Sequence, residues 1–253
     1  MDCQIKQHFL CKTMLFVVLS LFLQTTLAGP PFITEDPEPV DYKHYEIYLY
    51  SSVETLNSTV NFQAPALDWN YGLIPNVEIN VVIPFAINVS NDAMIANGAG
   101  LGDIQLGFDW RFIQESAHIP QVGFKPFYII PTGDSARGLG NSRPMITLPL
   151  WIQKSWGPLT TYGGGGYTIN QAPGMFNYFF GGMVVQYDLN DTWTLGGEVF
   201  TQGAISSSTG PTVIANFGGN YNVTKNFSIL FSGGHSINNT RSLVAYMGLH
   251  WVI

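Results

Sequence analysis

Charged side chains are scarce in this sequence and fall at alternate positions along short segments. Lys, Arg, Asp and Glu make up 11% of the 253 residues, whereas an average soluble domain carries about 25%. The same alternation predicts seven charged side chains on the polar faces of such segments: Glu46, Glu78, Asp103, Asp109, Arg111, Lys125 and Glu198. They are candidates for lining a polar conduit whose charges select solutes. The alternative is a salt-bridge network that fills a narrow interior.

A glycine-rich loop carries the second group of candidate residues. Within the stretch 131–144, glycines surround Asp134, Arg137 and Arg143. Folded inward, these three charges would form a constriction that screens solutes. Alternatively the loop lies outside, and Asp–Arg pairing merely orders a glycine-rich turn. We favour this second interpretation.

The histidines do not form a catalytic or metal-binding pattern. Beyond residue 28 the sequence contains His44, His118, His235 and His250, and none has a metal-ligand spacing such as His-Glu-x-x-His. His235 precedes Ser236, and neighbours in a strand point to opposite faces, which is poor geometry for a base and its nucleophile. We therefore expect no enzymatic activity, no cofactor and no metal site.

Period-two alternation marks about twelve segments between residue 43 and the last residue. In the clearest case, residues 103–112, polar or small residues alternate strictly with apolar ones. Many segments reach the roughly 9–11 residues with which a tilted β-strand crosses a bilayer, and no stretch reaches the roughly 18 apolar residues of a membrane-spanning helix. The predicted strands are 43–52, 59–73, 77–89, 102–113, 121–131, 145–155, 159–169, 176–189, 193–202, 212–221, 227–235 and 241–253.

The composition of the polar face decides which face meets lipid. A soluble surface needs roughly 25–35% charged residues, but this face is mainly Gly, Ser, Thr, Asn and Gln. That composition suits the interior of a narrow barrel, so we expect an antiparallel up-and-down transmembrane β-barrel of about twelve strands. Five aromatic residues near strand ends would form its interfacial girdles: Tyr71, Trp110, Trp151, Trp193 and Trp251.

Short and long connections alternate, as an up-and-down barrel requires. Tight turns are expected at 74–76, 156–158, 190–192 and 223–226, with a longer turn at 115–120. Polar or glycine-rich loops are expected at 90–101, 132–144 and 203–211. With both termini on the periplasmic side, the tight turns face the periplasm and the long loops face the exterior.

The first 28 residues have the pattern of an export signal. Lys6 and Lys12 precede a short apolar core, and small residues end the segment. A proline-rich stretch without any period, 29–42, follows, and it either enters the lumen as a plug or hangs in the periplasm. The expected organisation is a signal peptide, 1–28, this N-terminal segment, 29–42, and a barrel over 43–253.

Removal of residues 1–28 changes the charge and the cysteine content of the chain. Eight basic and 16 acidic residues remain, a net charge of −8, which argues against nucleic acid as a partner. Cys3 and Cys11 are the only cysteines and both lie in the removed segment. Disulfides and thiolate metal sites are therefore not expected, and the remaining chain suits an oxidising periplasm.

Several blocks of sequence resemble a bacterial outer-membrane family named for the MetA pathway of phenol degradation. They are residues 29–49, 120–140 and 148–170 and the shorter "LGGEVF" at 195–200. The resemblance implies an outer-membrane β-barrel with a channel or transport role. It does not establish phenol as the substrate, because the name of the family comes from genetic context.

The sequence thus predicts a protein of the Gram-negative cell outer membrane that passes small solutes, hydrophobic or aromatic ones included. The expected partners are outer-membrane lipid, the small-molecule solute and the machinery that assembles such barrels. The alternative function is that of a structural or surface-interaction barrel with a closed lumen.

Overall fold

The structure is a computed structural model that describes residues 30–56, 59–90, 97–238 and 242–253. The predicted export signal, 1–28, lies outside the described residues. Within them, the structure contains no helix that is long and apolar enough to cross a membrane.

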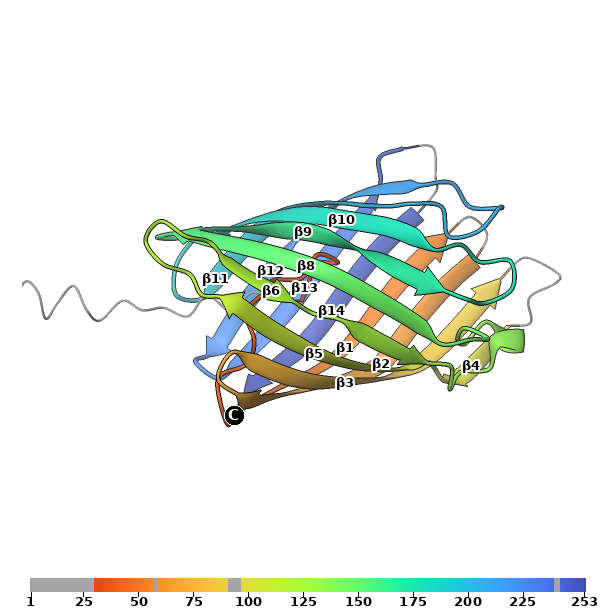
Figure 1. The fold of residues 1–253 in the computed structure, drawn as a ribbon, viewed down its shortest axis with the longest axis horizontal. Coiled ribbons are helices and arrows are strands. Elements are labelled where there is room, and N and C mark those ends of the chain that lie inside the picture. The colour runs from red at the N-terminus through yellow and green to blue at the C-terminus, as the bar shows by residue number, and fades with distance from the viewer. Residues whose placement is uncertain (1–29, 57–58, 91–96, 239–241) are drawn as a thin grey trace, which may run out of the picture.

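The described chain forms one closed antiparallel sheet (Figure 1). Its strands are β1 (Tyr45–Leu56), β2 (Thr59–Ile74), β3 (Val77–Ser90), β4 (Gly98–Leu101), β5 (Ile104–Ile113), β6 (Gln121–Phe124), β7 (Phe127–Ile130), β8 (Met145–Trp156), β9 (Leu159–Asn170), β10 (Tyr178–Asp188), β11 (Trp193–Gln202), β12 (Thr212–Thr224), β13 (Phe227–Ser236) and β14 (Ser242–Val252). One short 3₁₀ helix, η1 (Ser135–Arg137), lies in the loop after β7.

Two of the barrel strands are interrupted. A break at Gly102 and Asp103 separates β4 from β5, and a break at Lys125 and Pro126 separates β6 from β7. Proline has no backbone N–H to donate to the ladder, so an interruption at Pro126 follows from its chemistry. Counting each interrupted pair as one gives twelve spanning strands, and the predicted barrel of about twelve strands is confirmed.

The first and last strands close the barrel. β1 pairs with β14 along its length, from Glu46 opposite Val252 to Leu56 opposite Ser242. On the other side, β3 pairs with β5, and both β6 and β7 pair with β8. Closure matters because a free strand edge in lipid would leave backbone N–H and C=O groups without hydrogen bonds.

Side chains alternate between the two faces of the sheet as the sequence predicts. On β2 and β3 the outward residues are apolar and exposed, such as Leu67, Ile83 and Phe85, while the inward Asn70 and Asn80 are buried. An apolar outer face and a polar inner face are the pattern of a barrel in lipid.

Trp151 departs from the predicted aromatic girdle. Trp110 and Trp193 lie on the outer face, at the strand ends that carry the tight turns. Trp151 is only 2% exposed and points inward, where its ring centroid lies 6.1 Å from that of Phe180. The placement of Trp151 at the lipid interface was wrong because its strand neighbours Leu150 and Ile152 occupy the outward positions.

The two ends of the barrel differ. Figure 1 shows tight turns and the C-terminus at one end, called here the turn end, and longer connections with η1 at the other, the loop end. The short turns are those predicted around residues 75, 157, 191 and 225.

Because the outward face is apolar, we predict that a charged side chain placed on it destabilises the barrel by an amount that depends on its depth in the bilayer. Leu67 and Leu73 both lie outward on β2 and are 40% and 44% exposed, but Leu67 is central and Leu73 is near the turn end. Leu67→Arg should destabilise the barrel by about 2–4 kcal/mol, and the matched control Leu73→Arg by about 0–1 kcal/mol, because Arg is costliest at the bilayer midplane. Urea unfolding in lipid vesicles measures both, and equal losses would contradict the lipid-facing assignment.

Candidate functional site

A proline-rich segment crosses the lumen of the barrel. Residues 30–42, called here the N-terminal segment, form no strand, yet Phe32, Thr34, Asp36 and Val40 are buried. The four prolines of this segment have no backbone N–H groups, so fewer donors need partners in its interior position. The interpretation of these residues as a segment hanging in the periplasm therefore does not hold for the structure.

Two of the predicted lumen carboxylates hold the backbone of the N-terminal segment. Glu198 on β11 accepts hydrogen bonds from the backbone N–H groups of Ile33 (3.1 Å) and Thr34. Glu78 on β3 accepts one from the N–H of Val40 at 2.9 Å. Hydrogen bonds to a charged group contribute about 1.5–3 kcal/mol each, so these contacts fix the segment at two points about six residues apart.

Ion pairs connect the N-terminal segment to β5 and to the break between β6 and β7. Lys125, at the break between β6 and β7, lies 3.2 Å from Glu35 and 4.0 Å from Asp109. Arg111 on β5 lies 3.5 Å from Glu38. The structure thus brings Asp109, Arg111 and Lys125 together around the segment, which is closer to the predicted salt-bridge network than to a row of free charges.

Glu46 belongs to a separate cluster near the turn end. Its carboxylate accepts a hydrogen bond from the Tyr48 hydroxyl (2.7 Å) and lies 3.0 Å from His250 Nε2. The Tyr48 and His250 rings stack with their centroids 4.2 Å apart. Glu46 is inward-facing, as predicted, but it does not contact the N-terminal segment through any hydrogen bond or ion pair among the described residues.

Asp103 holds a loop at one end of the barrel. Its two carboxylate oxygens accept hydrogen bonds from the backbone N–H groups of Gly133 (2.9 Å) and Asn141 (2.6 Å). These residues lie at the two ends of the loop that contains η1. Asp103 therefore positions the glycine-rich loop at the loop end of the barrel.

The three charged residues of that loop do not form an ion-paired constriction. Asp134 caps η1 by accepting a hydrogen bond from Ala136 N–H at 3.1 Å. Arg137 and Arg143 are exposed, and in the described part of the chain no ion pair joins either of them to Asp134. The expected Asp–Arg pairing was wrong, because Asp103 and the Asp134 cap order the turn instead.

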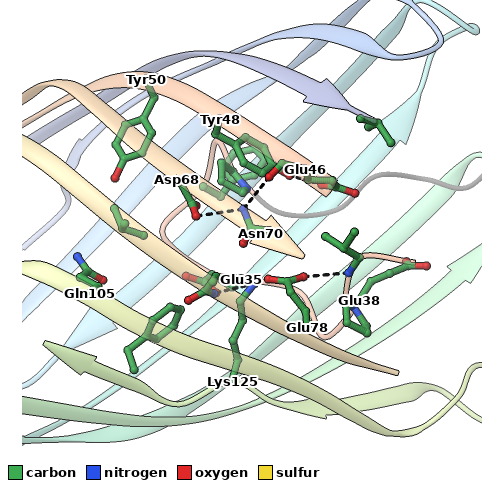
Figure 2. A pocket seen from close by; sticks show the side chains of 18 of the residues that line it. Glu35, Glu38, Glu46, Tyr48, Tyr50, Asp68, Asn70, Glu78, Gln105 and Lys125 are labelled. Atoms are coloured by element: carbon green, nitrogen blue, oxygen red, sulfur yellow. Dashed lines mark hydrogen bonds and ion pairs between the residues drawn. The ribbon is translucent and has the colours of Figure 1, made fainter. Parts of the chain in front are cut away.

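The N-terminal segment leaves cavities on its sides. One of them, called here the acidic cavity, has a volume of about 390 Å³ and lies toward the turn end between the segment and strands β1–β3 (Figure 2). A second, the aromatic cavity, has about 190 Å³ and includes Phe127, Trp151, Phe180 and Phe200 in its wall. A third of about 210 Å³ lies between the segment and β1, β12 and β14.

Some residues of this site were not among the predicted ones. Asp68 lines the acidic cavity, and it lies between the outward Leu67 and Trp69, so the alternation that found Glu78 could have found it. Glu35 and Glu38 lie in a segment without any period, and no local pattern places their side chains against Lys125 and Arg111.

Burial shifts two carboxyl groups of the N-terminal segment toward their protonated forms. Loss of hydration raises the pKa of Asp36 well above its ordinary value, against the attraction of Lys125. Loss of hydration also raises the pKa of Glu38, although hydrogen bonds from Gln121 and the charge of Arg111 act in the opposite direction. The described residues contain no group of three or more His, Cys, Asp or Glu side chains placed to hold a metal ion.

The sequence matches the model of the family described as "Putative MetA-pathway of phenol degradation" over residues 47–246. The chain belongs to this family. The match covers the barrel from β1 into β14. The family assignment is therefore consistent with the closed barrel and with an outer-membrane location. No curated protein matches the sequence.

Solved structures of outer-membrane barrels share the fold of this family member. The COG4313 outer membrane channel from Pseudomonas putida F1 is 14% identical with a TM-score of 0.72, and the alignment covers 86% of this chain and 98% of that one. The KdgM porin in complex with disordered oligogalacturonate is 9% identical, with a TM-score of 0.56 and coverages of 81% and 98%. The translocator domain of autotransporter NalP from Neisseria meningitidis is 12% identical, with a TM-score of 0.55 and coverages of 98% and 97%. At these identities the likeness concerns the fold.

The role of Asp103 predicts a loop that loosens when its carboxylate is removed. Asp103→Ala should expose the Arg137–Gly138 bond to trypsin, because the backbone N–H groups of Gly133 and Asn141 lose their acceptor. Asp103→Asn keeps one acceptor oxygen and should be cleaved at an intermediate rate. Mass spectrometry of the fragments measures cleavage, and equal rates for wild type and Asp103→Ala would contradict the role.

The raised pKa values predict tighter docking of the N-terminal segment at low pH. Protonated Asp36 and Glu38 favour the docked state, and this contribution is complete below their ordinary pKa values. It is lost as the pH rises through the raised values. Hydrogen exchange at the Thr34 amide, corrected for intrinsic rates, should therefore show less protection at high pH, and Asp36→Asn/Glu38→Gln should weaken this dependence. Greater protection at high pH would contradict the account.

Proposed function

We propose that this protein is an outer-membrane channel that passes small solutes, hydrophobic or aromatic ones among them, through the lumen past the N-terminal segment. The observation that carries this proposal is the space beside the segment. The acidic cavity alone measures about 390 Å³, within the roughly 300–1,000 Å³ typical of sites for small organic molecules.

The aromatic lining of the lumen supports hydrophobic or aromatic molecules as the solutes. Trp151, Phe180 and Phe200 point inward from β8, β10 and β11, with ring centroids 6.1 Å and 6.3 Å apart along the row. Inward aromatic residues are unusual in a water-filled lumen, which is generally polar. A flat apolar molecule could pack against them while the nearby Gln105 and Thr168 hydrogen-bond its polar groups.

The comparisons support the same proposal. The family description names a pathway of phenol degradation, and two of the structural relatives above are named as a channel and a porin. We therefore propose transport rather than catalysis.

The proposal extends to the biogenesis of the protein. We propose that residues 1–28 direct export and are then removed, and that the barrel-assembly machinery inserts the chain among outer-membrane lipids. An amphipathic barrel whose outer face is apolar needs such a route, because it would aggregate in water before insertion.

A closed structural barrel is the second candidate function, and the contacts of the N-terminal segment favour it over an open pore of fixed width. Glu78, Glu198, Lys125 and Arg111 all bind the segment. If these contacts never release, the lumen stays blocked and only the outer surface and loops remain for function.

A reversible tether distinguishes the two functions. A Cβ on Gly182 would lie 3.2 Å from Cβ of Thr34, just below the roughly 3.5–4.5 Å span of a disulfide, so Thr34→Cys/Gly182→Cys should cross-link the segment to β10. Single-channel recording in planar bilayers should give a lower conductance for the oxidised pair, restored by reductant. The single variant Thr34→Cys, the control, should not respond. Absence of conductance in wild type and in the reduced pair would favour the closed barrel.

A further inference from the structure

The acidic cavity contains more negative than positive groups. Its lining includes six carboxylates: Glu35, Glu38, Asp41, Glu46, Asp68 and Glu78. Lys125 and His44 are the basic residues of the same lining. Figure 2 shows Glu35, Glu38, Glu46, Asp68 and Glu78 around the cavity, with Lys125 reaching in from below.

The available positive charges are already engaged elsewhere in the cluster. Lys125 pairs with Glu35 and Asp109, and Arg111 pairs with Glu38. Asp68 accepts a hydrogen bond from Asn70 at 3.0 Å, and Glu78 accepts one from the Val40 N–H. Within the described residues, neither Asp68 nor Glu78 has a cation within ion-pair distance.

The patch around these two carboxylates also has unsatisfied acceptors. Glu78 Oε1 and Asn80 Oδ1 are buried and accept no hydrogen bond in the described structure, and both residues line the cavity at 3% and 4% exposure. Asn80 lies directly opposite Asn70 in the β2–β3 register, and Asp68 lies opposite Val82. Two buried oxygens of this patch, Glu78 Oε1 and Asn80 Oδ1, thus lack a donor, and a buried acceptor without a donor costs free energy.

The adjoining wall is aromatic. Tyr48, Tyr50 and Tyr246 line the same cavity from β1 and β14, and the rings of Tyr50 and Tyr246 have centroids 5.1 Å apart. Tyrosine rings attract organic cations through their negative faces. An ammonium group brings three hydrogen-bond donors and no acceptor, which is the complement of the patch on β2 and β3.

We propose that the acidic cavity binds small organic ammonium ions, with the charged group on the patch formed by Asp68, Asn80 and Glu78 and the organic part against the tyrosines. The cavity is far larger than a dehydrated metal ion, and its aromatic wall offers a contact surface for an organic part that a metal ion lacks. This inference rests on the proposed channel function and narrows its solutes to amines, aromatic amines included.

Equilibrium dialysis of the full chain in detergent micelles tests the site. The probes are phenethylammonium, the neutral 2-phenylethanol and the anion phenylacetate, which share a ring and differ in charge. Phenethylammonium should bind at least about tenfold more tightly than phenylacetate, and Asp68→Asn should weaken it by about tenfold, because a charge-assisted contact is lost. Glu54→Gln, the control, removes a carboxylate of the third cavity and should leave binding unchanged.

Three results would overturn the proposal. They are equal or tighter binding of phenylacetate, unchanged binding in both Asp68→Asn and Glu78→Gln, and displacement of phenethylammonium by potassium or calcium at the same concentration. If the Asp68→Asn protein does not assemble, Glu78→Gln provides the same test of binding. Conductance tests the channel function separately. If the protein conducts but does not bind the amine, only the proposed amine site is contradicted. If it binds the amine but does not conduct, only the proposed channel function is contradicted.

Discussion

The need to satisfy every backbone hydrogen bond in lipid is the constraint on which the rest of this structure depends. In hydrocarbon no water replaces a missing partner, so the ladder must close on itself. The pairing of β1 with β14 provides that closure. Once the ladder is closed, period-two alternation sends every second side chain inward, and the chemistry of the protein is confined to those positions and to whatever enters the lumen.

Closure of twelve strands also creates the space that the N-terminal segment occupies. A barrel of about eight strands is just wide enough for side chains to fill, and a wider one is left hollow unless another element enters. Here a proline-rich segment enters. Glu198 and Glu78 accept hydrogen bonds from backbone N–H groups of the other residues in this segment. The same carboxylates that would otherwise be lone charges in the lumen thereby become the attachment points of the segment.

The local pattern of the sequence was sufficient to predict the strands but not the contacts within the site. Alternation placed Glu78, Asp109 and Glu198 inward, because a β-strand has a fixed period and the structure confirms that pattern. Alternation with the outward Leu150 and Ile152 also accounts for the inward position of Trp151, which the assignment to an interfacial girdle misplaced. The ion pairs of Glu35 and Glu38 join residues about 73–90 positions apart, and no local pattern encodes such contacts. Similarly, the role of Asp103 depends on a loop that returns to it, so its assignment as a lumen charge missed its hydrogen bonds.

The lumen that results has two chemical zones, one acidic toward the turn end and one aromatic toward the loop end, separated by the N-terminal segment. The central claim is that this segment limits passage through an otherwise continuous lumen. The most direct measurement is the single-channel conductance of the wild type and of a chain lacking residues 30–40. Our account predicts a severalfold higher conductance after the deletion, and an unchanged conductance in a correctly assembled barrel would contradict it.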